Sequence, residues 1–302
     1  MRNQIVSEIF KESLKNRDIF TLTGDLGYGL FEPFMEKLPK QFINVGVSEQ
    51  NMITVAAGLA KEGKKVFVYS ISNFASLRCV EQIRNDICYH NLDVNILSNG
   101  AGYSYGPLGF SHHGTEDIAI MRSLPGLNIL SPGTTKEATL SVKQCLSSKK
   151  PHYLRIDKSF YDQDEISFSK SQGKIKILLL STGSIGEEAY LAAEEIYKSK
   201  KEIEIEIISI WNFNDINVSN EYIKHKVLEA DYIVTLEEHN ISGGFGSYVL
   251  ENYHENLARK KIKILGIENK LEQIVGSQNY LRKINHLDKK SIVKSILDFI
   301  SD

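Results

Sequence analysis

Hydrophobic residues along the chain gather in short runs that alternate with longer segments of helical period. In the first half of the chain, the short runs predict strands at 19–22, 41–45, 65–70, 93–98, 127–130 and 153–156. The helical period predicts helices at 3–16, 49–60 and 74–89. Strands and helices that alternate in this way are typical of an α/β domain with a mostly parallel sheet.

A polar stretch interrupts this pattern after the first set of strands. Residues 161–174 are rich in Asp, Gln, Ser and Lys, a composition typical of a linker. Beyond it the alternation resumes, with strands expected at 176–180, 204–210, 232–236 and 263–266 and helices at 187–199, 220–229, 246–256 and 289–299. The chain is therefore predicted to form two α/β domains with mostly parallel sheets, 1–160 and 175–302.

Length and composition are those of an ordinary soluble protein. A chain of 302 residues is long enough for about two domains of about 150 residues each. A net charge of −2 gives no electrostatic reason to expect nucleic acid or an anionic membrane surface as a partner. No apolar stretch reaches the length of a membrane span or a signal peptide. The three cysteines include no CxxC pair, which favours neither disulfides nor zinc and fits a reduced cytoplasm.

Glu49 is a candidate for chemistry because it begins a helix that should be largely buried. Acidic residues are favoured in the first turn of a helix, where they compensate the helix dipole. Alternatively, a buried carboxyl at such a position can protonate the nitrogen of a heterocycle, a role that needs burial strong enough to oppose the dipole. The residues alone leave both interpretations open.

A glycine-rich loop at 100–109 leads into Ser111-His112-His113. Such a loop lets the backbone approach a ligand closely, although it matches neither the Rossmann nor the P-loop fingerprint. The two histidines either line a cleft or lie exposed, and a metal site is disfavoured because adjacent histidines rarely point at the same ion. Arg155 and Lys158 bracket a strand end, where they either bind an anionic group such as a phosphate or remain solvated.

Several motifs share their order and spacing with one enzyme family. They are Asn44-Val-Gly-Val-Ser-Glu-Gln-Asn-Met52, Glu81-Gln-Ile-Arg84, Ser111-His-His113 followed by Glu116–Arg122, Tyr153-Leu-Arg155 and Glu237–Gly246. From about residue 2 to residue 300, the chain resembles the C-terminal half of a transketolase. The resemblance implies a pyrimidine-binding domain with the thiamine diphosphate-binding fold, followed by the transketolase C-terminal domain.

This resemblance also implies roles for individual residues around the cofactor. Glu49 falls on the family's invariant glutamate, which hydrogen-bonds N1′ of the aminopyrimidine ring of thiamine diphosphate and favours its imino tautomer. Asp25 falls on an acidic position near the cofactor and the dimer interface, and His112 on a histidine that meets the substrate. The family stacks an aromatic residue on the pyrimidine; here the candidate is Phe74 or, failing it, Tyr69.

Substrate contacts implied by the family are matched less completely. Lys158 falls on an arginine that contacts a phosphate, Arg2 matches a further phosphate arginine, and Arg155 and His113 complete the expected substrate-binding set. A lysine still provides a cation but loses the bidentate fork of an arginine.

Three other positions depart from the family pattern. Leu108 replaces an aspartate, Gly102 lies near the place of a sugar-contacting histidine, and Gly29 replaces a phosphate-contacting serine. The resemblance therefore implies sugar substrates, with sugar phosphates favoured, but does not name them.

Half of the expected catalyst is missing from the chain. Enzymes of this family bind Mg²⁺ through a Gly-Asp-Gly motif followed by an Asn, and the only Gly-Asp pair here is Gly24-Asp25, in the pyrimidine-domain context. The resemblance therefore implies a subunit that is inactive alone. An N-terminal transketolase subunit would hold the diphosphate and Mg²⁺, with a homodimer core in a two-plus-two heterotetramer.

Three functions are compatible with these patterns. The first is the C-terminal subunit of a transketolase, which transfers a two-carbon ketol unit between a ketose and an aldose. The second is a beta-type subunit of another thiamine diphosphate enzyme, a 2-oxo acid dehydrogenase or a deoxyxylulose-phosphate synthase. The third is a non-catalytic scaffold subunit that has kept the fold.

Overall fold

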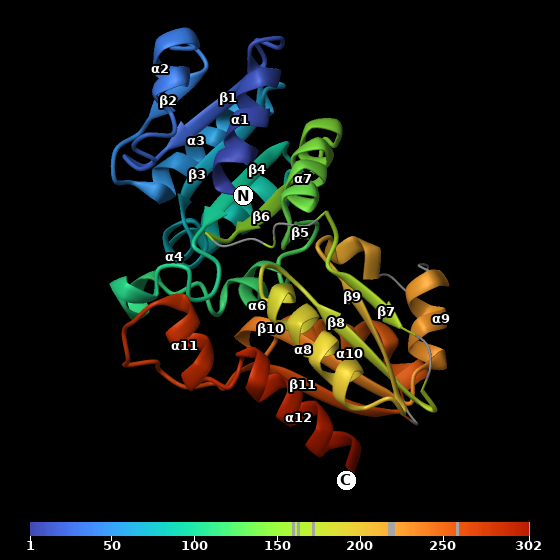
Figure 1. The fold of residues 1–302 in the computed structure, drawn as a ribbon. Coiled ribbons are helices and arrows are strands. Elements are labelled where there is room, and N and C mark those ends of the chain that lie inside the picture. Colours follow the sequence, from blue (N-terminus) through green and yellow to red (C-terminus); the bar gives the residue numbers. More distant parts are fainter. Residues whose placement is uncertain (159–160, 162–163, 171–172, 217–220, 258–259, 302) are drawn as a thin grey trace.

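A computed structural model describes residues 1–301 except 159–160, 162–163, 171–172, 217–220 and 258–259 (Figure 1). The first domain is built on a six-stranded sheet of order β2-β1-β3-β4-β6-β5, in which every paired strand runs parallel. Its strands are β1 (Ile19–Thr23), β2 (Phe42–Asn44), β3 (Lys65–Ile71), β4 (Val94–Asn99), β5 (Asn128–Leu130) and β6 (His152–Ile156).

Helices cover both faces of this first sheet. Helices α1 (Arg2–Ser13), α2 (Glu32–Lys37) and α7 (Thr135–Ser147) pack on one face, where Phe67 and Tyr69 of β3 join their core. Helix α3 (Glu49–Lys61) and the segment 72–88 pack on the other face, against Val66 and Val68 of the same strand. Neighbouring residues of β3 therefore serve opposite layers, as the period of two in a strand requires.

The second domain has a five-stranded sheet of order β11-β10-β8-β9-β7. Strands β8 (Ile175–Ser181), β9 (Ile203–Ser209), β10 (Tyr232–Asn240) and β11 (Lys261–Ile267) pair in parallel, and β7 (Ser167–Lys170) pairs antiparallel with β9. Helices α8 (Gly186–Ser199) and α12 (Lys289–Ser301) cover one face. Helices α9 (Glu221–Glu229) and α10 (Phe245–Leu257) cover the other. The expectation of two α/β domains with mostly parallel sheets is confirmed.

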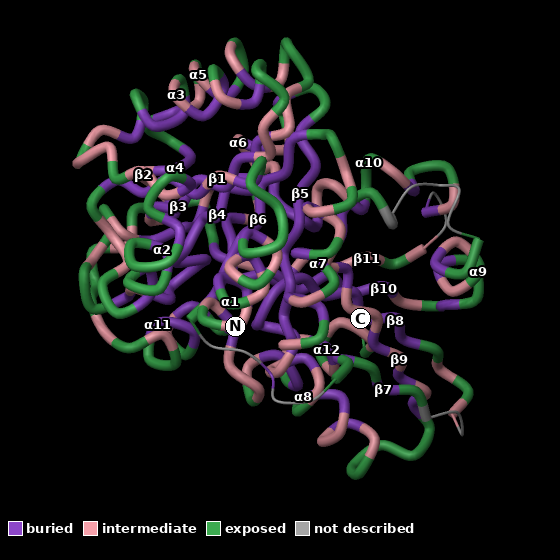
Figure 2. The backbone as a smooth tube through the Cα atoms, turned by 90° about the horizontal axis from the view of Figure 1, so that it is seen from above, coloured by how far each residue is buried: buried purple, intermediate pink, exposed green. Residues whose placement is uncertain are grey.

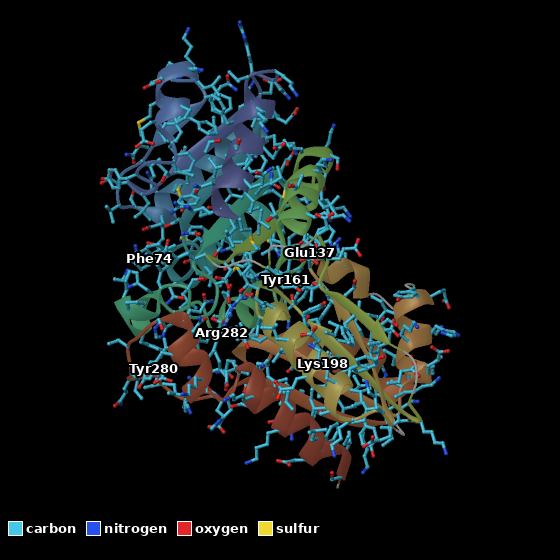
Figure 3. The ribbon with its side chains drawn as sticks, viewed as in Figure 1. Phe74, Glu137, Tyr161, Lys198, Tyr280 and Arg282 are labelled. Atoms are coloured by element: carbon cyan, nitrogen blue, oxygen red, sulfur yellow. The ribbon has the colours of Figure 1, made fainter. Side chains whose placement is uncertain are left out.

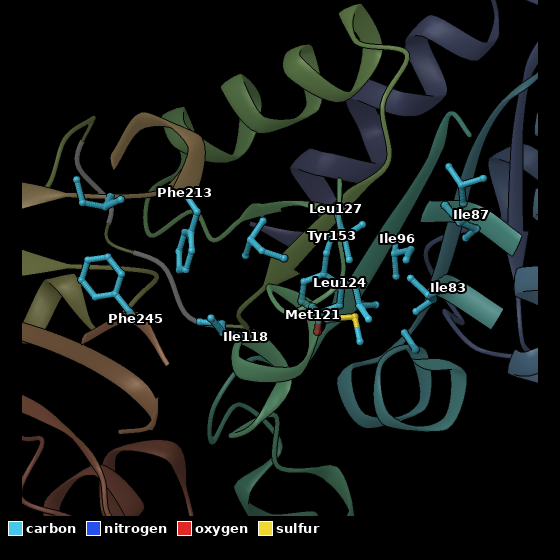
Figure 4. Close-up of a cluster of buried hydrophobic side chains, with 14 of the residues drawn as sticks. Ile83, Ile87, Ile96, Ile118, Met121, Leu124, Leu127, Tyr153, Phe213 and Phe245 are labelled. Carbon is cyan, nitrogen blue, oxygen red and sulfur yellow. The ribbon is translucent and has the colours of Figure 1, made fainter. Parts of the chain in front are cut away.

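One hydrophobic core runs from the first domain into the second. Ile118 and Met121 belong to helix α6 (Asp117–Met121), which lies between the two sheets. Figure 4 shows them between Ile83 and Ile87 of the first domain and Phe245 of the second. The buried positions in Figure 2 follow the strands, whereas the outer faces of the helices are exposed. Because the two domains share a core, their relative position is fixed by packing rather than by the linker alone.

The structure departs from two sequence-based predictions. The helix expected at 74–89 is broken into α4 (Ser72–Ala75), α5 (Val80–Gln82) and a π-helical stretch, Ile83–Cys88. Ser76 donates its hydroxyl hydrogen bond to the Ser72 carbonyl at 2.6 Å and has ψ −78°, so side-chain bonding competes with regular helix geometry there. Within the predicted linker, residues 167–170 form β7, while boundary residue 160 and part of the linker lie outside the described residues.

Four helices were not predicted from the sequence: α2, α6, α7 and α11 (Gln278–Ile284). Helix α7 carries a capping box in which Thr134 and Glu137 bond reciprocally to each other's backbone N–H, a pattern that is readable from sequence. Residue 220, the expected start of the helix at 220–229, lies outside the described residues. In the described part of the chain, no helix has the length and apolar character needed to cross a membrane.

Two buried histidines make the stability of the fold sensitive to acid. Burial lowers the pKa of His152 and of His239 to about 4, from an ordinary value of 6.5. A folded-state pKa below the unfolded value means that the stabilisation is present above pH 6.5 and is lost as the pH falls through 4. Protonation of each histidine is expected to lower the free energy of unfolding by up to about 3 kcal/mol as the pH falls from 6.5 to 4.

Urea unfolding at pH 7, 5.5 and 4.5 checks this expectation. The variant His239→Gln should lose less stability on acidification than the wild type does. His225→Gln, which changes a histidine with 68% of its side chain exposed, should follow the wild-type profile. Equal acid sensitivity of the wild type and His239→Gln would contradict the assignment.

Candidate active site

The candidate site lies where the central strands of the first sheet end. Because these strands are parallel, their carboxyl ends meet at one edge, which is where open α/β sheets bind ligands. Strand β3 ends beside β4, with Ile71 paired to Asn99, and β4 ends beside β6, with Asn99 paired to Ile156. Helix α3 brings Glu49 to this edge against Ser70 of β3.

Glu49 is buried, with 1% of its surface exposed. Its Oε1 atom accepts a hydrogen bond from the Ser70 hydroxyl at 3.2 Å, and its Oε2 atom pairs with Nη1 of Arg78 at 2.5 Å. Ser48 precedes the helix but donates its hydroxyl to the Val45 carbonyl instead of capping the helix. A Cβ atom at Gly24 would lie 3.5 Å from Glu49 Oε1, an ordinary contact distance, and 3.3 Å from the Gly46 carbonyl oxygen, which is tight.

An aromatic ring lies against the arginine that pairs with this carboxylate, and a histidine lies against that ring. The Arg78 guanidinium carbon lies 4.3 Å from the centroid of the half-buried Phe74 ring. His112 meets the same ring edge-on, with centroids 5.4 Å apart. Asn73 donates to the Ser111 carbonyl at 3.0 Å and thereby holds the histidine loop against α4. Glu49, Arg78, Phe74 and His112 therefore form one contiguous set.

Tyr69, the alternative aromatic candidate, lies on the opposite face of the sheet. It packs edge-on against Phe31 at 5.1 Å within the core beneath α1, and burial raises the pKa of its hydroxyl to about 12. Since Ser70 faces Glu49, its neighbour Tyr69 must face away. The geometry favours Phe74 as the ring beside Glu49.

Asp25 lies in the loop after β1 and is exposed. Its φ of +60° is unusual for a residue with a side chain, and a reciprocal pair of hydrogen bonds with Asn44, each 3.0 Å long, supports it. Asn44 also accepts from the Gly46 amide, so one side chain ties together the loops that flank Glu49.

The two adjacent histidines diverge. His112 is half-buried and faces Phe74, whereas His113 is buried against Tyr103, with ring centroids 5.1 Å apart. Nε2 of His113 lies 3.3 Å from the Gly106 carbonyl, and burial lowers its pKa below the ordinary value. His112 therefore lies beside Phe74, whereas His113 packs inside the glycine-rich loop.

A cavity of about 670 Å³ opens beside this edge of the sheet. It is lined by Met1, Arg2, Asn3, Gln4, Asn99, Tyr105, Thr135 and Lys158. Asn99 is 3% exposed, and its Oδ1 atom has no hydrogen-bond partner among the described residues. Arg2 and Lys158 add positive charge, so the cavity combines cations with an unsatisfied buried polar atom, a combination suited to a polar anionic ligand.

Arg155, although expected to bind substrate, is absent from this lining. It is 3% exposed, pairs with Asp117 at 2.9 Å and donates to the carbonyls of Gly114 and Glu238 at 2.8 and 3.0 Å. Its hydrogen-bonding capacity is thus directed to the protein interior. This geometry argues against a substrate contact and assigns Arg155 to the junction between the domains.

The second domain fixes the glycine-rich loop that borders the cavity. Glu238 pairs with Arg282 at 2.5 Å and accepts a hydrogen bond from the Tyr103 amide at 2.6 Å. Gly102 has φ +55°, and a Cβ atom there would lie 2.5 Å from Glu238 Oε1, so the position of Glu238 requires glycine. Arg282 comes from α11 and lies where that helix meets the first domain (Figure 3).

Four residues that shape the site do not stand out in the sequence as site residues: Arg78, Asn99, Glu238 and Arg282. Glu238 lies within the motif Glu237–Gly246, yet its bond with the Tyr103 amide forms only because the two domains pack together. Arg78 lies four residues after Phe74, a spacing that on a regular helix indicates contact, although the helix is broken here. In the described ranges, no group of three or more His, Cys, Asp or Glu side chains is arranged to hold a metal ion.

Comparison with known proteins places this geometry in a family. The profile of the transketolase pyrimidine-binding domain matches residues 2–163, and that of the transketolase C-terminal domain matches residues 169–278. The chain belongs to the transketolase family. Its position within the family corresponds to a C-terminal transketolase subunit.

Individual relatives of the chain are themselves transketolase subunits. An apulose-4-phosphate transketolase subunit from Phocaeicola vulgatus is 31% identical, over 99% of this chain and 97% of its own length. The protein of the same name from Actinobacillus succinogenes is 30% identical, over 96% and 95%. Among solved structures, a split gene transketolase described as an inactive beta4 tetramer matches with a TM-score of 0.82 and 25% identity, covering 99% of this chain and 97% of its own.

The pair of Glu238 and Arg282 gives a test of how the domains hold the site. Replacing Arg282 with Met should leave Glu238 buried without its cation and lower the free energy of unfolding by about 3–5 kcal/mol. The double variant Arg282→Met/Glu238→Gln should recover part of that loss, because the uncompensated charge is gone. Guanidinium unfolding of the single and double variants measures the coupling; strictly additive losses would contradict it.

Proposed function

We propose that this chain is the C-terminal subunit of a thiamine diphosphate-dependent transketolase, which transfers a two-carbon ketol unit between a ketose and an aldose. The observation that carries the proposal is the buried Glu49 carboxylate at the edge of the sheet, beside Phe74 and His112. In a chain of this family, Glu49 stands at the position that meets the cofactor's aminopyrimidine.

The residues present fit the cofactor. The Arg78 guanidinium is planar and donates hydrogen bonds, and it lies over Phe74 while it contacts Glu49. A planar ring with a protonated or proton-accepting nitrogen needs the same two partners, a ring face and a carboxyl group. Glu49 would hold N1′, Ser70 would orient the carboxyl, and Phe74 would support the pyrimidine. Bound thiamine diphosphate would supply the carbanion chemistry of ketol transfer.

The diphosphate and Mg²⁺ are proposed to be held by a separate N-terminal subunit. The names of the relatives, which describe transketolase subunits and a split gene transketolase, support a divided enzyme. We propose a two-plus-two heterotetramer with a homodimer core of this chain, in which the exposed Asp25 lies near the dimer interface. The isolated chain is then expected to be inactive.

Sugar phosphates are the proposed substrates, with their anionic group in the cavity beside the sheet edge. Arg2 and Lys158 supply the positive charge, and Asn99 and Tyr105 supply polar contacts. His112 lies on the Phe74 side of the site and would meet the sugar hydroxyls near the reacting carbon. Lysine in place of the family's arginine gives a point charge that tolerates several orientations of an anion.

Calorimetry with thiamine diphosphate and Mg²⁺ tests the proposal directly. The titration is made into the purified chain, and then into the chain mixed with a diphosphate-domain partner. Binding only in the mixture, followed by ketol transfer without decarboxylation, is expected. Binding to the isolated chain would contradict the divided cofactor site, and absence of binding in both would favour a scaffold.

Glu49→Gln separates assembly from turnover. The amide keeps the size and the contact with Ser70 but lacks the proton-transfer capacity of a carboxyl, so the complex should assemble and turnover should fall by at least about 100-fold. Gel filtration measures assembly and a coupled ketol-transfer assay measures turnover. Activity that survives in Glu49→Gln would rule out the proposed role of the carboxyl.

Lys158→Ala tests the anionic subsite. Removing the cation should raise KM for a phosphorylated sugar about tenfold while changing kcat much less, because the phosphate is remote from the reacting carbon. The effect should disappear with an unphosphorylated sugar. Lys150→Ala, which removes an exposed lysine outside the cavity, serves as the control. A matching loss for both sugars would argue against the phosphate contact.

A further inference from the structure

Arg78 makes, from within the chain, the two contacts that the site would offer to a planar ligand. Its Nη1 atom lies 2.5 Å from Oε2 of Glu49, and its guanidinium carbon lies 4.3 Å from the centroid of Phe74. An arginine can stack on an aromatic ring and bond a carboxylate at once because its charged group is planar and forked. In the free chain, Arg78 therefore occupies the carboxylate of Glu49 and the ring face of Phe74, the two groups proposed to meet the cofactor.

The two sides of this contact are held very differently. Glu49 is 1% exposed and begins the thirteen-residue helix α3, whereas the Arg78 side chain is 44% exposed. Arg78 lies on a single 3-10 turn, Leu77–Cys79, within the broken segment between α4 and α5. The carboxylate is thus fixed in the interior, while the guanidinium reaches it from the solvent side and can withdraw by side-chain rotation.

We infer that Arg78 is an internal competitor for the aminopyrimidine position, paired with Glu49 in the free chain and displaced when the cofactor binds. This inference rests on the proposed function for the identity of the ligand. It assigns Arg78 a positioning role rather than a catalytic one, because the residue acts through Glu49 and Phe74.

There are physical reasons for a pair of Arg78 with Glu49 in a subunit that has not yet bound its partner. A buried carboxylate without a cationic partner is destabilising because its charge has lost its contact with water, so Glu49 would destabilise the free chain if nothing paired with it. The pair with Arg78 offsets that cost. It also lowers apparent affinity for the cofactor, because only the fraction of molecules with the pair open can bind. A ligand that replaces both contacts displaces Arg78, and one that replaces a single contact does so less well.

A double-mutant cycle on the free 302-residue chain, with Arg78→Met, Glu49→Gln and the double variant, measures the pair without any cofactor. Arg78→Met should lower the melting temperature by several degrees, and Arg78→Met/Glu49→Gln should recover much of that loss. Arg84→Met changes an exposed arginine that bonds Asn85 in the same segment and should leave the melting temperature unchanged. Additive effects of the two site substitutions would overturn the inference.

Cofactor affinity supplies the second readout. In the complex with the diphosphate-domain partner, Arg78→Met should lower the Kd for thiamine diphosphate plus Mg²⁺ about tenfold, and Arg78→Lys, which keeps the charge but not the fork, should lower it less. Unchanged or weaker binding by Arg78→Met would overturn the inference.

Turnover by the Glu49→Gln complex separates this inference from the proposed function. A wild-type complex that binds no cofactor, or a Glu49→Gln complex that turns over as the wild type does, counts against the proposed function itself. Lost turnover in Glu49→Gln combined with unchanged binding by Arg78→Met leaves the proposed function standing and removes only the competitor.

Discussion

Charged side chains buried between two domains are tolerated only when each pairs with an opposite charge and its remaining donors and acceptors also form hydrogen bonds. This constraint governs the junction next to the site. Arg155 pairs with Asp117 and donates to the Glu238 carbonyl, and Arg282 pairs with Glu238 and lies 3.9 Å from Asp157. The Arg155–Asp117 pair lies within the first domain and the Arg282–Glu238 pair within the second. The two pairs are joined across the junction by the bond from Arg155 to the Glu238 carbonyl and by the approach of Arg282 to Asp157, both of which separation of the domains would remove.

The loop that borders the cavity takes its shape from this junction. Glu238 accepts from the Tyr103 amide and occupies the space where a side chain at residue 102 would begin, so the first domain must have glycine there. Ser104 donates to Asp157, and Asp157 in turn receives the Ser184 hydroxyl from the second domain. The glycine at position 102, which departs from the family pattern, is therefore explained by packing of Glu238.

The parallel strands and helix α3 are predictable from the sequence because their signals are local: short apolar runs for the strands, and helical period with an Ala-rich face for the helix. The sequence ranks Phe74 before Tyr69 as the ring beside the pyrimidine, but it cannot place either ring relative to Glu49, since the face on which α3 packs is a tertiary property. The period of two in a strand places Tyr69 and Ser70 on opposite faces of the sheet, but it does not say which of the two faces Glu49. Arg155 was expected to contact an anionic ligand because it lies near the end of a strand. Its actual partners, Asp117 and a backbone carbonyl of the second domain, are brought to it only by the tertiary structure.

Large apolar side chains lie exposed in the segments that follow the strands of the first sheet. Tyr28, Val47, Leu77, Leu108 and Phe110 are 80%, 76%, 43%, 56% and 43% exposed, respectively. Each lies in a segment that follows a strand of the first sheet, namely β1, β2, β3 or β4, and so belongs to the same edge as Glu49. Isolated exposed apolar residues are common, but a set gathered at one edge is typical of a surface that another protein covers. A chain that supplies the aminopyrimidine half of a site would need that cover at this edge, because water left there would weaken the electrostatic contacts of the Glu49 carboxylate.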